Sequence, residues 1–181
     1  MARDEPRANR ENIFLVGCRG AGKTSVSRLL AGPLGWDWVD TDAVLEARSG
    51  RSIRAIFTDE GEAAFRDKEA QVLEELCRHQ HQVIATGGGV VLRAENRERL
   101  RAAGWVVWLT ADAATLWQRL LADDTTAERR PNLSRGGLDE VAELLRLREP
   151  WYRSCADLIV STVGLTPQEV TGAILAGWEV A

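Results

Sequence analysis

The sequence predicts an α/β fold in which helices cover both faces of one parallel β-sheet. Short apolar, β-branched runs alternate with longer amphipathic runs five times along the chain, and parallel strands need such crossover segments between them. The length of 181 residues and the 45% share of hydrophobic residues suit one domain with a single core. We expect a charged tail at 1–11 and one domain at 12–181.

The strands are predicted from short apolar runs that end in glycine, aspartate or another turn residue. Each run has three to five residues, as is typical of strands that are buried in a parallel sheet. In chain order, strands are expected at 13–16, 36–39, 82–86, 105–109 and 158–160. The carboxyl ends of such strands form the edge at which α/β proteins bind their ligands.

The helices are predicted from apolar residues that recur with the helical period between these strands. They are expected at 23–30, 42–48, 53–57, 60–78, 93–103, 111–121, 138–156 and 167–177. Gly32 and Pro33 should end the first helix early, and Thr110 or Asp112 should cap the helix that begins near 111. The polar, glycine-containing segment at about 122–137 has no period and is expected to be a loop.

Charge and composition exclude several classes of protein. The formal net charge of −4 argues against a protein that covers a nucleic-acid backbone. The longest fully apolar run, 105–109, is far shorter than a membrane-spanning helix, and the charged first residues do not resemble a signal peptide, so we expect a cytoplasmic protein. Cys18, Cys77 and Cys155 share no close spacing, which favours reduced thiols over a disulfide framework or a zinc site.

A candidate phosphate-binding loop follows the first predicted strand. Residues 17–24 read Gly-Cys-Arg-Gly-Ala-Gly-Lys-Thr and match G-x-x-x-x-G-K-[ST] at the junction of a strand and a helix. In such a loop, backbone N–H groups and the helix N-terminus bind phosphate. The lysine, Lys23, would reach the β- and γ-phosphates, and Thr24 could bind Mg²⁺. The loop therefore predicts binding of a nucleoside triphosphate.

Two aspartates follow the second predicted strand. Asp40 and Asp42 are two residues apart, so strand alternation could point both carboxylates to one side. One could then hold Mg²⁺ through water, and the other could accept a proton from a substrate hydroxyl. The alternative is a turn aspartate followed by a helix cap, because aspartate is favoured in both places.

Three glycines and several arginines are further candidates. Residues 87–89 are glycines at the end of the third predicted strand, and they indicate either a tight turn or a close approach of the backbone to a substrate. Arg66, Arg148, Arg129 and Arg130 are either solvated surface residues or groups that grip a carboxylate and stabilise a transferring phosphoryl group.

Taken together, these residues resemble the shikimate kinase family. The resemblance extends from about Asn12 to the last helix, and its motifs agree in identity, order and spacing. The motifs are the loop at 17–24, Asp40-Thr-Asp42, Ile56-Phe57, Gly61-Glu-Ala-Ala-Phe-Arg-Asp-Lys-Glu69, Gly87-Gly-Gly89, Arg130-Pro131 and Arg148-Glu-Pro-Trp-Tyr152.

The resemblance implies the fold of nucleoside monophosphate kinases, a three-layer P-loop kinase fold with a five-stranded parallel sheet and a mobile lid at about 122–137. It implies that the γ-phosphate of ATP is transferred, with Mg²⁺, to the 3-hydroxyl of shikimate. The product would be shikimate 3-phosphate, on the chorismate route to aromatic amino acids. It further implies a monomer with small-molecule partners, and neither nucleic acid nor a membrane as a partner.

The resemblance also implies a role for each matching residue. The catalytic residues would be Asp42 as base, Lys23 at the phosphates, and Arg130 from the lid, with Arg129 as the alternative lid arginine. The metal would be bound by Thr24 directly and by Asp40 through water. The residues implied to contact ATP are Gly20, Ala21, Gly22, Lys23, Thr24, Ser25 and Arg130. The matching motifs do not place the arginine that packs on adenine, and Arg119 is our candidate for it.

For the acceptor, the resemblance implies that Arg66 and Arg148 grip the carboxylate while Glu69 holds Arg66. Asp42 would form hydrogen bonds with the ring hydroxyls. The other residues implied to line the acceptor site are Gly87, Gly88, Gly89, Phe57 and Phe65. Two alternatives stay open from the residues alone: another small-molecule kinase of this fold, acting on gluconate or a nucleoside monophosphate, and a nucleotide-binding regulator without transferase activity.

Overall fold

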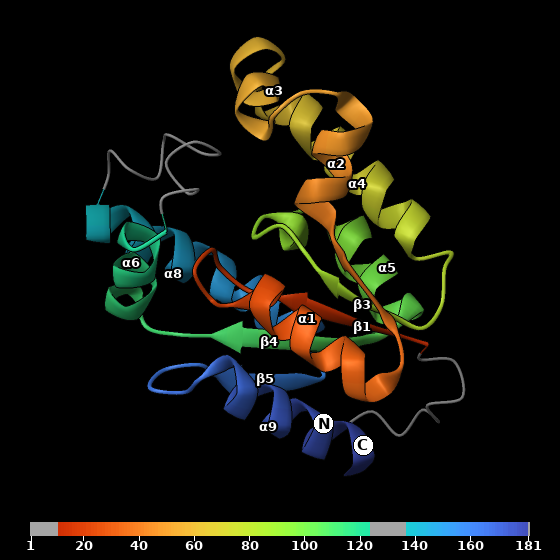
Figure 1. Ribbon diagram of the computed structural model, residues 1–181. Helices are drawn as coiled ribbons and strands as arrows, with labels where there is room; N and C mark the ends of the chain where they lie inside the picture. The colour runs from red at the N-terminus through yellow and green to blue at the C-terminus, as the bar shows by residue number, and fades with distance from the viewer. Residues whose placement is uncertain (1–10, 124–136, 181) are drawn as a thin grey trace.

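A computed structural model describes residues 11–123 and 137–180 and confirms the three-layer α/β fold (Figure 1). Five parallel strands form one sheet in the order β2-β3-β1-β4-β5. The strands are β1 (Asn12–Val16), β2 (Asp37–Asp40), β3 (Gln82–Ala85), β4 (Trp105–Thr110) and β5 (Leu158–Ser161). The crossover segments between them are helical, as parallel pairing requires.

The helices divide between the two faces of the sheet and one end of it. They are α1 (Lys23–Leu34), α2 (Thr41–Ser49), α3 (Ile53–Asp59), α4 (Gly61–Leu76), α5 (Ala94–Ala103), α6 (Ala113–Leu121), α8 (Gly137–Cys155) and α9 (Pro167–Val180), with the short 3₁₀ helix η1 (Val90–Leu92). Helices α1 and α9 pack on one face, and α5 and α8 pack on the other. Helices α2 and α3 pack against α4, away from the sheet (Figure 1). Within the described ranges, no helix combines the length and apolar character needed to span a bilayer.

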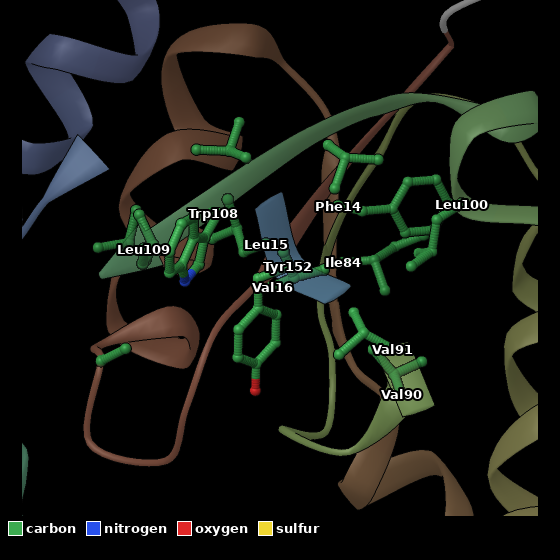
Figure 2. Packing of buried hydrophobic residues seen from close by; sticks show 14 of the residues in the cluster. Phe14, Leu15, Val16, Ile84, Val90, Val91, Leu100, Trp108, Leu109 and Tyr152 are labelled. Atoms are coloured by element: carbon green, nitrogen blue, oxygen red, sulfur yellow. The ribbon is translucent and has the colours of Figure 1, made fainter. Parts of the chain in front are cut away.

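The core is centred on β1 and β4. Every residue of β1 is buried, which explains the uninterrupted apolar run at 13–16, because a central parallel strand is covered on both faces. Tyr152 of α8 lies among these residues, and its ring centroid is 5.7 Å from that of Trp108 (Figure 2). Burying a side chain as large as Phe14 contributes about 2–3 kcal/mol. This packing fixes the carboxyl end of β1 and therefore the loop that follows it.

The predicted end of the first helix is wrong. Helix α1 continues through Gly32 and Pro33 to Leu34, and it ends at Gly35, whose φ of 65° is left-handed. The N–H of Gly35 bonds back to the carbonyl of Gly32 at 3.1 Å. Proline interrupts a helix because it lacks an N–H and crowds the carbonyl four residues earlier. One proline in the final turn costs little, and the left-handed glycine is the stop signal.

The segment after the second strand also differs from the alternation argument. Strand β2 ends at Asp40, and Asp42 lies in the first turn of α2 rather than on extended backbone. Farther along the chain, η1 follows the three glycines and was not predicted. Helix α6 begins at Ala113, where Asp112, one of the two expected caps, accepts from the Thr115 N–H at 2.7 Å.

Candidate functional site

The loop between β1 and α1 has a backbone that depends on glycine. Gly17, Gly20 and Gly22 have φ values of 143°, 81° and 90°, which disfavour other residues. A Cβ at Gly17 would also lie 2.3 Å from the carbonyl oxygen of Leu109. Gly22 directly precedes α1, so the first-turn N–H groups of that helix face the loop and can bind an anion.

The Lys23 side chain folds back over this loop. Its Nζ donates to the carbonyl oxygens of Gly17 and Cys18, each at 2.9 Å. The loop opens into a cleft of about 280 Å³ that Lys23 lines together with Asp40, Asp42 and other residues. The structure thus brings the predicted phosphate-binding residues and both aspartates to one cavity.

Asp40 is at once a helix cap and a neighbour of the loop. Its Oδ1 accepts from the N–H groups of Asp42 and Ala43 at 3.0 and 3.3 Å, which caps α2. Its Oδ2 accepts from the Thr24 hydroxyl at 2.7 Å. The cap reading and the site reading of Asp40 are therefore compatible, because the cap fixes the carboxylate beside Thr24.

Thr24 and Asp40 supply the kind of oxygen donors that suit Mg²⁺. This cation keeps several waters and takes one or two carboxylates together with substrate phosphates. Within residues 11–123 and 137–180, no cluster of three or more His, Cys, Asp or Glu side chains could hold a metal by itself. The donor set therefore fits a metal that is bound jointly with a nucleotide.

The three glycines at 87–89 are needed for space. None of them has a left-handed φ, but a Cβ at Gly87 would lie 2.7 Å from Glu69 Oε1 and 2.9 Å from Asp42 Oδ1. A Cβ at Gly89 would lie 2.2 Å from Arg66 Nη1. Any side chain at Gly87 or Gly89 would therefore displace a charged group. The backbone of the turn thus comes close to charged side chains of the protein, and its approach to a substrate stays a prediction.

Gly88, the middle glycine, lies between the two halves of the site. A Cβ there would be 3.4 Å from the Gly17 carbonyl oxygen and 3.6 Å from Arg148 Nη1. Gly88 is therefore close both to the phosphate loop and to an arginine of α8. The turn is the place where the nucleotide-binding elements meet the predicted acceptor-binding side chains.

Arg66 is a buried residue of α4 and not a solvated one. Only 7% of its surface is exposed, and its Nη1 donates to Glu69 Oε2 at 2.7 Å. Burial lowers the pKa of the Arg66 guanidinium, but the contacts with Glu69 and Glu62 outweigh this and raise the pKa above its ordinary value. Because its pKa is raised, Arg66 remains charged. Its guanidinium carbon lies 5.1 Å from the centroid of the Phe65 ring.

The two predicted apolar residues lie next to this arginine. The rings of Phe57 and Phe65 are 4.5 Å apart between centroids, and Phe65 is fully buried. They form one wall beside the guanidinium, with Phe57 supplied by α3 and Phe65 by α4.

Arg148 and Tyr152 of α8 converge on the glycine turn. Arg148 Nη1 and the Tyr152 hydroxyl both donate to the Gly88 carbonyl, at 3.3 and 2.5 Å. The Tyr152 hydroxyl is also 3.8 Å from Cys18 Sγ, and burial raises the pKa of Tyr152 well above its ordinary value. No function was predicted for Tyr152 itself. Its spacing of four residues from Arg148, on one helix face, is the signal that could have found it.

Arg119 connects the loop to the far edge of the sheet. Its Nη1 donates to the Gly20 carbonyl at 3.2 Å and to Thr162 Oγ1 at 2.9 Å, and its Nη2 donates to the Thr162 carbonyl at 2.7 Å. It lines the cleft together with Arg19 and Asp123, neither of which was predicted. Arg129 and Arg130, with most of the predicted lid, lie outside the described residues.

Comparisons with known proteins agree on one family. The family model described as shikimate kinase matches residues 19–178. A shikimate kinase of Symbiobacterium thermophilum is 46% identical over 167 residues, which cover 91% of this chain and 94% of that protein. One of Rhodopirellula baltica is 42% identical over 166 residues, covering 91% and 89%. The solved structure of a shikimate kinase from Acinetobacter baumannii in complex with shikimate has a TM-score of 0.88, is 37% identical and covers 94% of each chain.

Proposed function

The chain belongs to the shikimate kinase family, and from this premise we propose how its own residues perform that family's reaction. The reaction is the phosphorylation of shikimate with ATP as co-substrate, in the biosynthesis of aromatic amino acids. The single observation that carries the proposal is the glycine turn. Gly87, Gly88 and Gly89 lie against Asp42, Arg148 and Arg66 in that order, while Gly88 also borders the phosphate loop.

On the donor side, the phosphate loop would hold the triphosphate of ATP. The N–H groups at the start of α1 would face the phosphate oxygens, and Lys23 would exchange its two carbonyl contacts for the β- and γ-phosphates. Both anionic substrates approach a protein of net charge −4, so local cations have to offset the repulsion. Lys23 would do so at the phosphates, and Arg119 would lie near the base of the nucleotide.

Mg²⁺ would be held by Thr24 directly and by Asp40 through water. The hydroxyl and the carboxylate are already 2.7 Å apart, which supports a shared role. When bound, the cation would offset the charge of the phosphate oxygens.

On the acceptor side, Arg66 and Arg148 would bind the carboxylate from two directions. Planar guanidinium groups pair with carboxylates through parallel N–H bonds, and the two arginines lie against neighbouring glycines of one turn. Phe57 and Phe65 would form the apolar wall beside the ring.

Asp42 would orient the acceptor hydroxyl and take its proton. The hydroxyl oxygen would then form the new bond to the γ-phosphorus as the bond to ADP breaks, so the proton ends on the Asp42 carboxylate. Phosphoryl transfer depends mainly on positioning and on charge stabilisation. From the family resemblance, we propose that Arg130 supplies a further cation at the transferring group.

The acceptor can be tested by measuring ADP release in a coupled assay. Shikimate should stimulate turnover, whereas gluconate, AMP and CMP should not. Stimulation by gluconate or a nucleotide in place of shikimate would assign the chain to another kinase of the same fold. Turnover of ATP that no acceptor stimulates would contradict a transferase function altogether.

The role of the arginines can be tested with Arg66→Ala and Arg148→Ala. Each variant should raise the KM for shikimate by at least about tenfold, as expected when a charged hydrogen bond is lost, with the KM for ATP nearly unchanged. Arg153→Ala is the matched control, because Arg153 is also on α8 and pairs with Glu149 at the surface. Equal effects on both KM values would remove the arginines from the acceptor site.

A further inference from the structure

The Arg66 guanidinium carries five N–H groups, and two residues of its own helix accept three of them. Nε and Nη2 donate to Oε1 of Glu62 at 3.3 and 3.1 Å, and Nη1 donates to Oε2 of Glu69 at 2.7 Å. Among the described residues this leaves one N–H on Nη1 and one on Nη2. The side edge of the guanidinium, formed by Nε and Nη2, is therefore occupied by Glu62. The end formed by Nη1 and Nη2 still has N–H groups that can donate.

The two glutamates differ in their surroundings. They lie four residues before and three residues after Arg66, so all three side chains share one face of α4. Glu69 is 2% exposed and packs beneath the arginine, whereas the Glu62 side chain is 64% exposed and covers it from the solvent side. Glu69 is thus the inner support of Arg66, and Glu62 is the outer one.

The Nη1–Nη2 end of Arg66 faces the glycine turn. A Cβ at Gly89 would lie 2.2 Å from Nη1 and 2.5 Å from Nη2, so the backbone approaches this end. Glu62 contacts the side edge that Nε and Nη2 form. The remaining N–H groups are therefore on the side of Arg66 that faces the glycine turn.

We propose that Glu62 is a positioning residue that fixes the rotation of the Arg66 guanidinium, so that Nη1 and Nη2 meet the acceptor carboxylate together. This inference rests on the proposed role of Arg66 in binding the carboxylate of shikimate. Without Glu62, the Nε edge of the guanidinium would be exposed to water. The long arginine side chain would then regain rotational freedom, and binding of the acceptor would have to remove that freedom again. An amide oxygen at position 62 could still accept from the same edge.

Glu62 could instead weaken the binding of the acceptor. The Glu62 carboxylate could stand in for the acceptor carboxylate and compete with it, since it carries the same charge and bonds the same arginine. The two roles predict opposite changes. Removal of a positioning residue weakens acceptor binding, whereas removal of a competitor strengthens it.

Steady-state kinetics of Glu62→Ala, Glu62→Gln and Asp67→Ala separate these roles. We expect Glu62→Ala to raise the KM for shikimate about tenfold, within the range of coupling between contacting side chains, with kcat and the KM for ATP changed by less than about twofold. Glu62→Gln should restore most of the affinity. Asp67→Ala is the control. Asp67 is on the same helix as Glu62, its side chain is 63% exposed, and it also forms one ion pair, with Arg93.

A neutral acceptor tests whether the effect of Glu62→Ala depends on the acceptor carboxylate, which a merely structural role of Glu62 would not require. With the methyl ester of shikimate, wild type and Glu62→Ala should differ by less than about twofold, because the charged partner of Arg66 is gone. A lower KM for shikimate in Glu62→Ala, an unchanged KM, or an equal loss with the ester would each overturn the inference.

Arg66→Ala distinguishes failure of this inference from failure of the proposed function. If Arg66→Ala raises the KM for shikimate and Glu62→Ala does not, the function stands and the role of Glu62 falls. If Arg66→Ala leaves that KM unchanged, the carboxylate is bound elsewhere, and both fall together.

Discussion

Individual residues of the site are packed so closely that glycine is required between them. Gly87 borders the carboxylates of Glu69 and Asp42, and Gly89 borders Arg66. A side chain at Gly87 or Gly89 would occupy the space of a charged group, and charged groups with fixed partners move at considerable cost. The turn therefore sets the distance between Arg66 and Asp42.

Gly89→Ala tests this packing directly. Because the added Cβ would lie 2.2 Å from Arg66 Nη1, we expect the guanidinium to move and the KM for shikimate to rise at least about tenfold, with little change in the KM for ATP. Gly172→Ala in α9 is the control, since nothing lies within 4 Å of its Cβ position. Unchanged kinetics in Gly89→Ala would show that the turn does not hold Arg66 in its active position.

Asp42→Asn tests the proposed base. We expect kcat to fall by about 10²–10⁴-fold, the usual contribution of a positioned base, while ATP binding measured by calorimetry stays the same. The amide keeps the size of the side chain but loses its negative charge and its ability to take the proton. A kcat within about threefold of wild type would remove Asp42 as the base.

Single residues of the site were predictable to different degrees. Lys23, Thr24, Asp40 and the glycine turn follow strands, so the sequence pattern alone places them at one edge of the sheet. Tyr152 follows no strand, and its only sequence signal is its spacing of four residues from Arg148 on one helix face. That spacing indicates a shared direction, but the contact with the Gly88 carbonyl depends on how α8 packs.

At the scale of elements, Asn12 joins three segments where the sheet begins. This buried side chain donates to the carbonyls of His79 and Ala103 at 2.7 and 3.4 Å, and it accepts from the Gln82 N–H at 3.0 Å. It thus connects β1 to β3 and to the segments that follow α4 and precede β4. The elements are held together at the edge opposite to the cleft.

Asn12→Ala should destabilise the fold without changing the chemistry. Leaving buried backbone groups without their partner costs about 1–3 kcal/mol, so we expect the urea midpoint to fall, with kcat and both KM values of the folded protein nearly unchanged. An unaltered midpoint would mean that water replaces the amide at no cost. A large loss of kcat would mean that this edge influences the cleft.

The elements themselves were largely predictable, and their ends were less so. In the part of the chain that the structure describes, apolar runs and helical periods located the five strands and the eight α-helices, since burial on the sheet imposes those patterns. The end of α1 was not predictable from Gly32 and Pro33, because the cost of a proline depends on how many turns follow it. The short helix η1 follows from the way the glycine turn packs on its neighbours.

At the scale of the whole molecule, an acidic protein gathers cations around the phosphate loop and the glycine turn. The net charge is −4, yet Lys23, Arg66 and Arg148 lie around the phosphate loop and the glycine turn. Such a local arrangement can attract anions whatever the total charge. Among the described residues, seven other arginines pair with surface carboxylates, and such exposed ion pairs contribute little to stability.

The stability of the whole molecule should depend on buried thiols at high pH. Burial raises the pKa of Cys155 to about 11, from the ordinary 9.0. The folded protein therefore keeps a proton that the unfolded chain loses above pH 9, so this contribution to stability is complete below pH 9 and is lost as the pH rises towards 11. A shift of this size corresponds to at most about 3 kcal/mol.

Urea denaturation at pH 8, 9 and 10 can measure this dependence. The free energy of unfolding should fall as the pH rises, and Cys155→Ala should show a shallower fall than wild type. The comparison isolates Cys155, because Cys77 and Tyr152, whose pKa values are also raised by burial, remain in both proteins. Identical pH slopes would contradict the assignment of Cys155 as a protonated, buried thiol.

The most direct test of the account is a crystal structure of the protein with shikimate bound. The carboxylate should lie between Arg66 and Arg148, beside Gly88 and Gly89, with a ring hydroxyl within hydrogen-bonding distance of Asp42. A carboxylate bound elsewhere, or a ring whose hydroxyls point away from Asp42 and the phosphate loop, would contradict it.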